Sequence, residues 1–213
     1  MTEIKTIFWD IGGVLLTNGW DEHQRARVLG KYGVDMSETE PRHHEENPRW
    51  ERGEITAREY FARTVFFKRR DFTFEELWPD VKAESVLLHA ENFDILQSLA
   101  DSKDYSLAVL SNESRELNAY RYAKWQLKKY FEYFISSCYV GMLKPNLEIY
   151  QLALDLAQTA PQQTIFIDDR IRNTEPAASL GIDAIQFESP GQLRHALSER
   201  GIHTPAAATH SNS

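Results

Sequence analysis

Apolar residues gather in five short segments of the chain, and the three strongest end on polar side chains. These three are residues 4–10, 106–112 and 164–169. Their continuous β-branched and aromatic runs, without strict alternation, are typical of strands that are buried on both faces of a parallel sheet. Two weaker runs, 133–138 and 183–187, are expected to join them as further strands.

Between the predicted strands, apolar residues recur every three or four positions, as they do in amphipathic helices. The clearest such stretches are residues 85–100, 115–127 and 147–157. Strands that alternate with helices predict a right-handed βαβ arrangement, here an α/β, Rossmann-like wound parallel sheet. Ligands of such sheets bind beyond the carboxyl ends of the strands, so the polar residues at those ends are candidate site residues.

Residues 17–82 are different, because they are rich in Arg and Glu and carry no strand pattern. Their pattern predicts three or four helices. We therefore interpret these residues as a helical insertion after the first strand. Within the cluster 43–46, two histidines precede two glutamates, and we expect this cluster in a solvated loop. Four residues are expected to break the helices: Gly33, Pro41, Pro48 and Gly53.

The pattern divides the chain into an α/β core, residues 1–16 plus 83–203, and a helical cap, residues 17–82. The remaining segment, 204–213, contains small polar residues without periodicity, and we expect it to be disordered. The 213 residues suit one core domain with a large insertion.

Composition narrows the class of protein further. The net charge of −8 is not typical of a nucleic-acid-binding protein. No apolar run approaches the roughly 18 residues that a membrane span needs. The amino-terminal segment lacks the layout of a signal peptide. The single cysteine, Cys138, has no internal disulfide partner, which fits a reducing compartment. We therefore expect a soluble, cytoplasmic protein without nucleic-acid or membrane partners.

Candidate chemistry begins at the ends of the first two predicted strands. Asp10 precedes Gly12 and Gly13, a tight turn that a phosphoryl group can approach. Ser111 and Asn112 end the second strong strand and carry hydroxyl, amide and N–H groups that bind phosphate oxygens. Taken singly, each also fits a plain structural role, as a loop cap or a turn.

Two further signals lie later in the chain. Lys144 precedes Pro145 just before a predicted helix, where an ammonium group can neutralise an anion, although most loop lysines are merely solvated. Asp168 and Asp169 close the fourth strand. Two adjacent buried carboxylates repel each other unless a cation compensates them, and oxygen ligands suit Mg²⁺.

The order of these elements is more specific than any one of them. The sequence resembles the haloacid dehalogenase-like superfamily in four motifs. These are an Asp after the first strand, Ser-Asn after the second, Lys-Pro before a helix, and Asp-Asp with a trailing Asn after the fourth strand. The resemblance runs from Ile7 to about Phe187. Residues 17–82 lie where that superfamily has a C1-type helical cap, and residues 51–56 look like a recurrent cap segment. The motif around Asp10 is similar to subfamily IA, in the branch of the epoxide-hydrolase N-domain and glucose-1-phosphate phosphatase.

The resemblance implies an Mg²⁺ site and a covalent mechanism. It makes Asp10 the nucleophile that forms an aspartyl-phosphate. It places Mg²⁺ on the Asp10 carboxylate, the Gly12 backbone carbonyl and Asp169. Asp168 is implied as a further metal ligand or as a residue that contacts the ligands. Asn173 is implied as the residue that orients the metal side of the site.

The resemblance also implies a phosphate site. Lys144 would neutralise the nucleophile and the transferring phosphoryl group, and Ser111 and Asn112 would bind its oxygens. Phosphoryl transfer needs such groups, because its catalysis is mostly positioning and charge stabilisation. The expected protein is an Mg²⁺-dependent phosphohydrolase of a small phosphorylated metabolite, with sugar phosphates as one such class.

Gly12 departs from the family pattern, which usually has a second Asp at this position as the general acid and base. Glycine retains the carbonyl but has no group for proton transfer, which is worth roughly 10²- to 10⁴-fold in rate. One alternative is therefore a non-catalytic or regulatory protein, and another is a haloacid dehalogenase-type hydrolase. Four acidic or imidazole side chains nearby are candidate substitutes for the missing group: Glu113, Asp21, Glu22 and His23.

Overall fold

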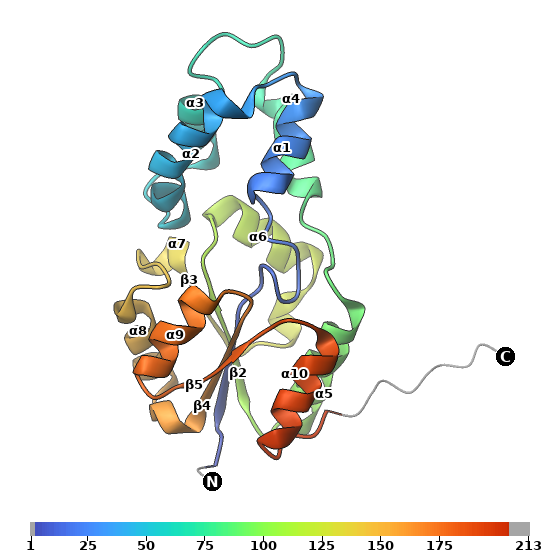
Figure 1. Ribbon diagram of the computed structural model, residues 1–213, viewed down its shortest axis with the longest axis vertical. Coiled ribbons are helices and arrows are strands. Elements are labelled where there is room, and N and C mark those ends of the chain that lie inside the picture. Colours follow the sequence, from blue (N-terminus) through green and yellow to red (C-terminus); the bar gives the residue numbers. More distant parts are fainter. Residues whose placement is uncertain (1–2, 205–213) are drawn as a thin grey trace, which may run out of the picture.

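The computed structural model describes residues 3–204 and contains a five-stranded parallel sheet at its centre (Figure 1). The order β3-β2-β1-β4-β5 places β1 in the middle of the sheet. All five predicted strand segments are confirmed, whereas the predicted disordered tail lies outside the described residues except for Thr204. The strands are β1 (Thr6–Trp9), β2 (Ser106–Ser111), β3 (Tyr133–Ser136), β4 (Thr164–Asp168) and β5 (Asp183–Gln186).

Helices cover both faces of the sheet. Ile7 and Trp9 of β1 point to one face, which is covered by α5 (Ala90–Ser102) and α10 (Pro190–Glu199). Phe8 points to the other face, where α8 (Leu147–Ala157) and α9 (Ile171–Ser179) pack. Since both faces are buried, the strands need apolar residues at every position, and the α/β wound fold predicted from that pattern is confirmed.

Four helices form an insert between β1 and α5, beyond the carboxyl ends of the strands (Figure 1). The insert has its own apolar core, in which the rings of Trp50 and Tyr60 stack at 4.3 Å between centroids. Its helices are α1 (Glu22–Lys31), α2 (Met36–Glu51), α3 (Ala57–Thr64) and α4 (Phe74–Ala83). Within residues 3–204, no helix has the length and apolar character that crossing a membrane requires.

The predicted breaks at Pro41 and Pro48 are wrong, because α2 continues through both prolines. Each proline removes one helical hydrogen bond, at a cost of up to about 3 kcal/mol. Tertiary packing outweighs that cost, since α2 buries His43 and Trp50 against the other insert helices. The cluster 43–46 is accordingly helical, and the prediction of a solvated loop there is also wrong.

The predicted helix 85–100 begins later than expected, with Ala90 as the first residue of α5. The segment before it pairs with the chain after β1 instead. Thr17 N–H donates to the Val86 carbonyl at 3.0 Å, and Leu88 N–H donates to the Leu15 carbonyl at 3.1 Å. These backbone bonds flank an isolated antiparallel bridge between Leu16 and Leu87, and they join the two chain segments that connect the insert to the core.

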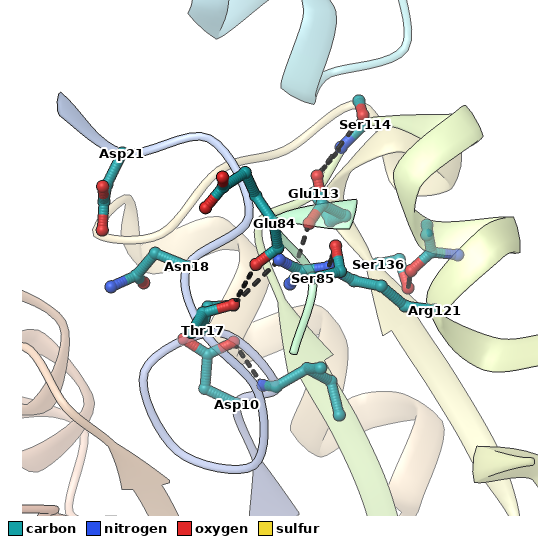
Figure 2. Close-up of polar contacts among 12 residues, drawn as sticks. Asp10, Thr17, Asn18, Asp21, Glu84, Ser85, Glu113, Ser114, Arg121 and Ser136 are labelled. Atoms are coloured by element: carbon teal, nitrogen blue, oxygen red, sulfur yellow. Dashed lines mark hydrogen bonds and ion pairs between the residues drawn. The ribbon is translucent and has the colours of Figure 1, made fainter. Parts of the chain in front are cut away.

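Arg121 of α6 (Arg115–Lys124) ties these connecting segments to the sheet (Figure 2). Its side chain is 2% exposed and donates from Nη2 to the Thr17 carbonyl at 2.8 Å and from Nε to Ser85 Oγ at 3.1 Å. Nη1 lies 3.0 Å from Oε2 of the buried Glu113, which follows β2 closely. One guanidinium thus links both insert connections to the end of a central strand.

We predict that Arg121→Gln destabilises the fold by about 3–5 kcal/mol, because it leaves the Glu113 charge buried without its partner. Urea unfolding measures the change in the free energy of unfolding. Arg58→Gln is the matched control, since the Arg58–Glu75 pair is exposed on both sides and such pairs contribute about 0–1 kcal/mol. Equal effects of the two substitutions would contradict the role given to Arg121.

Candidate active site

Three carboxylates meet where the two central strands β1 and β4 end. The paired register of Trp9 with Ile167 brings Asp10 beside Asp168 and Asp169. One oxygen from each carboxylate lies within 4.8 Å of the others. The parallel sheet therefore gathers residues that are about 160 positions apart in the sequence at its carboxyl edge, where wound sheets bind ligands.

Lys144 lies between two of these carboxylates. Its Nζ is 3.0 Å from Asp10 Oδ2 and 2.5 Å from Asp168 Oδ2, and the residue is 4% exposed. Burial alone would lower the pKa of Lys144, but the two carboxylates outweigh burial and raise it. The ammonium group is thus held in its charged form.

The Asn112 side chain fixes the loop that carries Lys144. Its Nδ2 donates to the Lys144 carbonyl, and its Oδ1 accepts from the Lys144 N–H, both at 2.9 Å. The amide that is expected to bind phosphate thus also holds the lysine backbone. Ser111 is buried beside Asp10, and its hydroxyl, like Lys144, opposes the rise that burial causes in the pKa of that carboxyl.

Asp168 is surrounded by donors. Asn173 Nδ2 donates to both of its oxygens, at 2.9 and 3.0 Å, and Arg170 N–H donates to Oδ1 at 2.9 Å. Burial would raise the pKa of Asp168, but Lys144 and these hydrogen bonds hold it below its usual range. Asp168 is therefore an ionised residue that orients Lys144 and Asn173.

Asp10 and Asp169 are poorly compensated by comparison. Burial raises the pKa of Asp10 from 3.8 to about 7, although Lys144 opposes the shift. Burial and the nearby Asp168 also raise the pKa of Asp169. Asp169 Oδ1 is buried and has no hydrogen-bond partner in the described part of the chain. Arg170 Nε approaches Asp169 Oδ2 only to 3.9 Å, so the positive charge nearby does not offset the burial of these two carboxylates.

An Mg²⁺ ion fits this donor set. The orphaned Asp169 oxygen and the Asp10 carboxylate are hard ligands of the kind that Mg²⁺ prefers, and Gly12, whose backbone oxygen is the further expected ligand, borders the same cavity. Gly13 makes the arrangement possible. Its φ is +76°, and a Cβ there would lie 2.3 Å from the Asp169 carboxylate. A larger residue at position 13 would push this carboxylate away from the loop.

A cavity of about 560 Å³ opens over these groups, between the strand ends and the insert. From the core it is bordered by Asp10, Lys144 and Asn173, among others. The insert contributes a wall from α2, including the residues His43 and Glu51. Sequence reasoning missed this wall, because a charged helical face looks the same whether it borders solvent or a cavity.

The space beside Gly12 is occupied by other polar groups. A Cβ on Gly12 would lie 3.3 Å from Asn18 Oδ1 and 3.6 Å from Arg121 Nη1. Of the four candidate substitutes, Glu113 is paired with Arg121 (Figure 2). Asp21 caps α1 by accepting from the Gln24 N–H. The other two, Glu22 and His23, are exposed, and Glu22 borders the cavity.

Comparison with known proteins confirms the family. The pattern of haloacid dehalogenase-like hydrolases matches residues 4–181, and the chain belongs to this family. Flavin mononucleotide hydrolase 1 of Arabidopsis thaliana is 30% identical over 154 residues, which are 72% of this chain and 61% of that protein. Bifunctional epoxide hydrolase 2 of Sus scrofa is 33% identical over 100 residues, 44% of this chain and 18% of that protein.

A relative of nearly equal length is D-ribitol-5-phosphate phosphatase of Bacteroides thetaiotaomicron, 25% identical over 206 residues, with 91% of this chain and 97% of that protein covered. The fold is shared with a HAD family enzyme of the same organism, at a TM-score of 0.76 and 23% identity over 92% of this chain and 99% of that one. The longer relatives extend well beyond this chain, which spans 18% and 61% of the two named above.

We predict that Mg²⁺ stabilises the protein more strongly at pH 8 than at pH 6. Without metal, the raised pKa of Asp10 means that ionising this group costs stability as the pH rises from about 4 through about 7. Mg²⁺ offsets this cost, but below pH 7 it must displace a proton, and its affinity falls up to about tenfold per pH unit.

Thermal unfolding with and without MgCl₂ across this pH range measures the effect, with NaCl at equal ionic strength as the control. Asp10→Asn should weaken both the stabilisation and its pH dependence. A magnesium effect that is the same at every pH, or the same with NaCl, would contradict the assignment.

Proposed function

We propose that this protein is an Mg²⁺-dependent phosphohydrolase that acts on a small phosphorylated metabolite through an aspartyl-phosphate on Asp10. The observation that supports this most directly is the charge arrangement at the strand ends. A buried ammonium group faces Asp10, while the poorly compensated pair Asp10 and Asp169 suits a divalent cation. A phosphate dianion needs both kinds of positive charge.

The proposed reaction has two steps. An Asp10 carboxylate oxygen attacks phosphorus, and the bond from phosphorus to the leaving oxygen breaks, so that an alkoxide departs and takes a proton from water. Water then attacks the same phosphorus, which releases phosphate and restores the carboxylate. Lys144 balances the charge of the transferring group, and Asp168 and Asn173 hold Lys144 and this side of the site in place. Bound Mg²⁺ supplies the remaining positive charge at the phosphoryl oxygens.

The relatives support a small phosphate ester as substrate. The two named phosphate hydrolases act, by their names, on flavin mononucleotide and on D-ribitol-5-phosphate. Both molecules carry the phosphate on the terminal carbon of a ribityl chain. A structural relative at 24% identity was solved with magnesium and inorganic phosphate. Sugar and polyol phosphates are therefore the first compounds to test.

The second candidate is a non-catalytic or regulatory protein, and Gly12 is the observation that favours it. Loss of a general acid alone leaves room for turnover, because enzymes accelerate phosphomonoester hydrolysis by up to about 10²¹-fold and this acid contributes roughly 10²- to 10⁴-fold. A dehalogenase is disfavoured, since carbon–halogen hydrolysis has no use for uncompensated carboxylates beside Asp10.

We predict Mg²⁺-dependent release of phosphate from p-nitrophenyl phosphate and D-ribitol 5-phosphate. Asp10→Asn should reduce kcat by roughly 10⁴-fold or more, because the nucleophile is lost. Asp94→Asn, a change on α5 away from the strand ends, serves as the control and should retain full activity. Absence of turnover across a broad panel of phosphate esters, despite measurable Mg²⁺ binding, would instead favour the non-catalytic protein.

A further inference from the structure

One face of α2 presents a row of polar side chains to the cavity. His43, Asn47 and Glu51 are spaced four residues apart and all border the cavity. Residues at this spacing lie nearly above one another on a helix, about 6 Å apart along its axis. The row therefore spans about 12 Å. We call these three residues the α2 row.

The lower end of the row is fixed to the core. The Glu51 backbone carbonyl accepts from Ser137 Oγ at 2.6 Å, and the same hydroxyl accepts from the Glu113 N–H at 3.0 Å. Gly53 allows this close approach, because its φ is +71° and a Cβ there would lie 2.2 Å from the Cys138 carbonyl oxygen. Glu51 is thus held near the strand ends, with its carboxylate on the cavity wall.

The upper end of the row is a histidine in a defined state. Trp20 Nε1 donates to the Tyr60 hydroxyl at 3.1 Å, and that hydroxyl lies 2.7 Å from His43 Nδ1. Burial lowers the pKa of His43 to about 3, with a further contribution from Arg25, so the ring is neutral. Because the Tyr60 hydroxyl accepts from Trp20 and lies closest to Nδ1, we assign its own proton to the bond with His43.

With this assignment, the proton of the neutral His43 ring is on Nε2. This nitrogen has no protein partner in residues 3–204. Within the row, the Asn47 amide and the Glu51 carboxylate interact through a side-chain hydrogen bond, and no further side-chain partner of either is seen in residues 3–204. The α2 row thus offers the cavity the His43 ring and, beside it, an amide and a carboxyl group that interact with each other.

The charges along this wall disfavour a second anionic group on the ligand. The Arg25 guanidinium, which also borders the cavity, is paired through Nε and Nη2 with Glu40 and donates from Nη1 to the Trp20 carbonyl. Its charge is therefore neutralised within the insert. Burial raises the pKa of Glu51, while its hydrogen bond to Asn47 and the charges of Arg170 and Arg172, which border the cavity on the core side, oppose the shift.

We propose that the α2 row is a leaving-group subsite that binds the hydroxyl groups of an open-chain polyol phosphate. This assignment rests on the proposed phosphatase function and adds the residues that select its substrate. Alternating donors and acceptors match successive hydroxyl groups, which both donate and accept. The length of the row lets an extended chain follow it away from the phosphate bound at Asp10 and Lys144.

The test compares two substrates that differ in their hydroxyl groups, D-ribitol 5-phosphate and n-pentyl phosphate. We expect the wild-type protein to prefer the polyol in kcat/KM. His43→Leu and Asn47→Leu should each reduce that preference about tenfold, the typical loss for one hydrogen bond to substrate. His43→Gln retains an N–H donor in the row and should recover part of the preference. Glu45→Gln changes the exposed side of α2 and should leave both rates unchanged.

The outcomes separate this inference from the proposed function. Hydrolysis of both substrates with equal kcat/KM, or an unchanged preference in the His43 and Asn47 variants, would overturn the subsite while leaving the phosphatase intact. Hydrolysis of neither substrate by the wild-type protein would overturn the proposed function and the subsite together. Circular dichroism of each variant distinguishes a lost contact from a lost fold, and the half-exposed Asn47 carries the test if the buried His43 variants unfold.

Discussion

The structure depends on the charge balance at the carboxyl ends of β1 and β4. Three carboxylates converge there, and Lys144 is the ammonium group that contacts two of them. Like charges in a poorly solvated site raise one another's pKa, and a cation within hydrogen-bond reach reverses the effect. Lys144 achieves this for Asp168 but not for Asp10 or Asp169. The site is therefore built to receive more positive charge than the chain supplies.

Other residues hold these charged side chains in their positions. Asn112 clamps the backbone of Lys144, Asn173 binds the Asp168 carboxylate, and Gly13 lets Asp169 approach the loop after β1. The insert then covers the edge of the sheet where these groups meet (Figure 1). Arg121 links the two insert connections to the end of β2. The insert, which borders the cavity, is therefore held in a fixed position relative to the charged groups at the strand ends.

Much of the fold followed from the sequence, because strands buried on both faces need uninterrupted apolar runs. The site residues at the strand ends were also predictable, since parallel strands in a wound sheet share one functional edge. The course of α2 was not. Pro41 and Pro48 are local signals against a helix, and only the packing of His43 and Trp50 against other insert helices overrides them.

Side-chain partners were the least predictable part of the site. Asn112 reads as a phosphate ligand in the sequence, yet its amide spans a gap of 32 residues to clamp Lys144. Arg121 lies on an ordinary amphipathic helix, and nothing in its spacing marks it as a buried residue close to Gly12. Such contacts arise from the approach of distant segments, which no local pattern encodes.

In the proposed mechanism, Gly12 leaves the charge arrangement as the main source of catalysis, and the fate of Asp10 is therefore the central question. Rapid acid quenching during turnover, followed by mass spectrometry of proteolytic peptides, measures it directly. The account predicts a phosphoryl group on the peptide that contains Asp10, dependent on Mg²⁺ and absent in Asp10→Asn. Release of phosphate with no phosphoryl group on that peptide, and with Asp10→Asn as active as the wild-type protein, would contradict it.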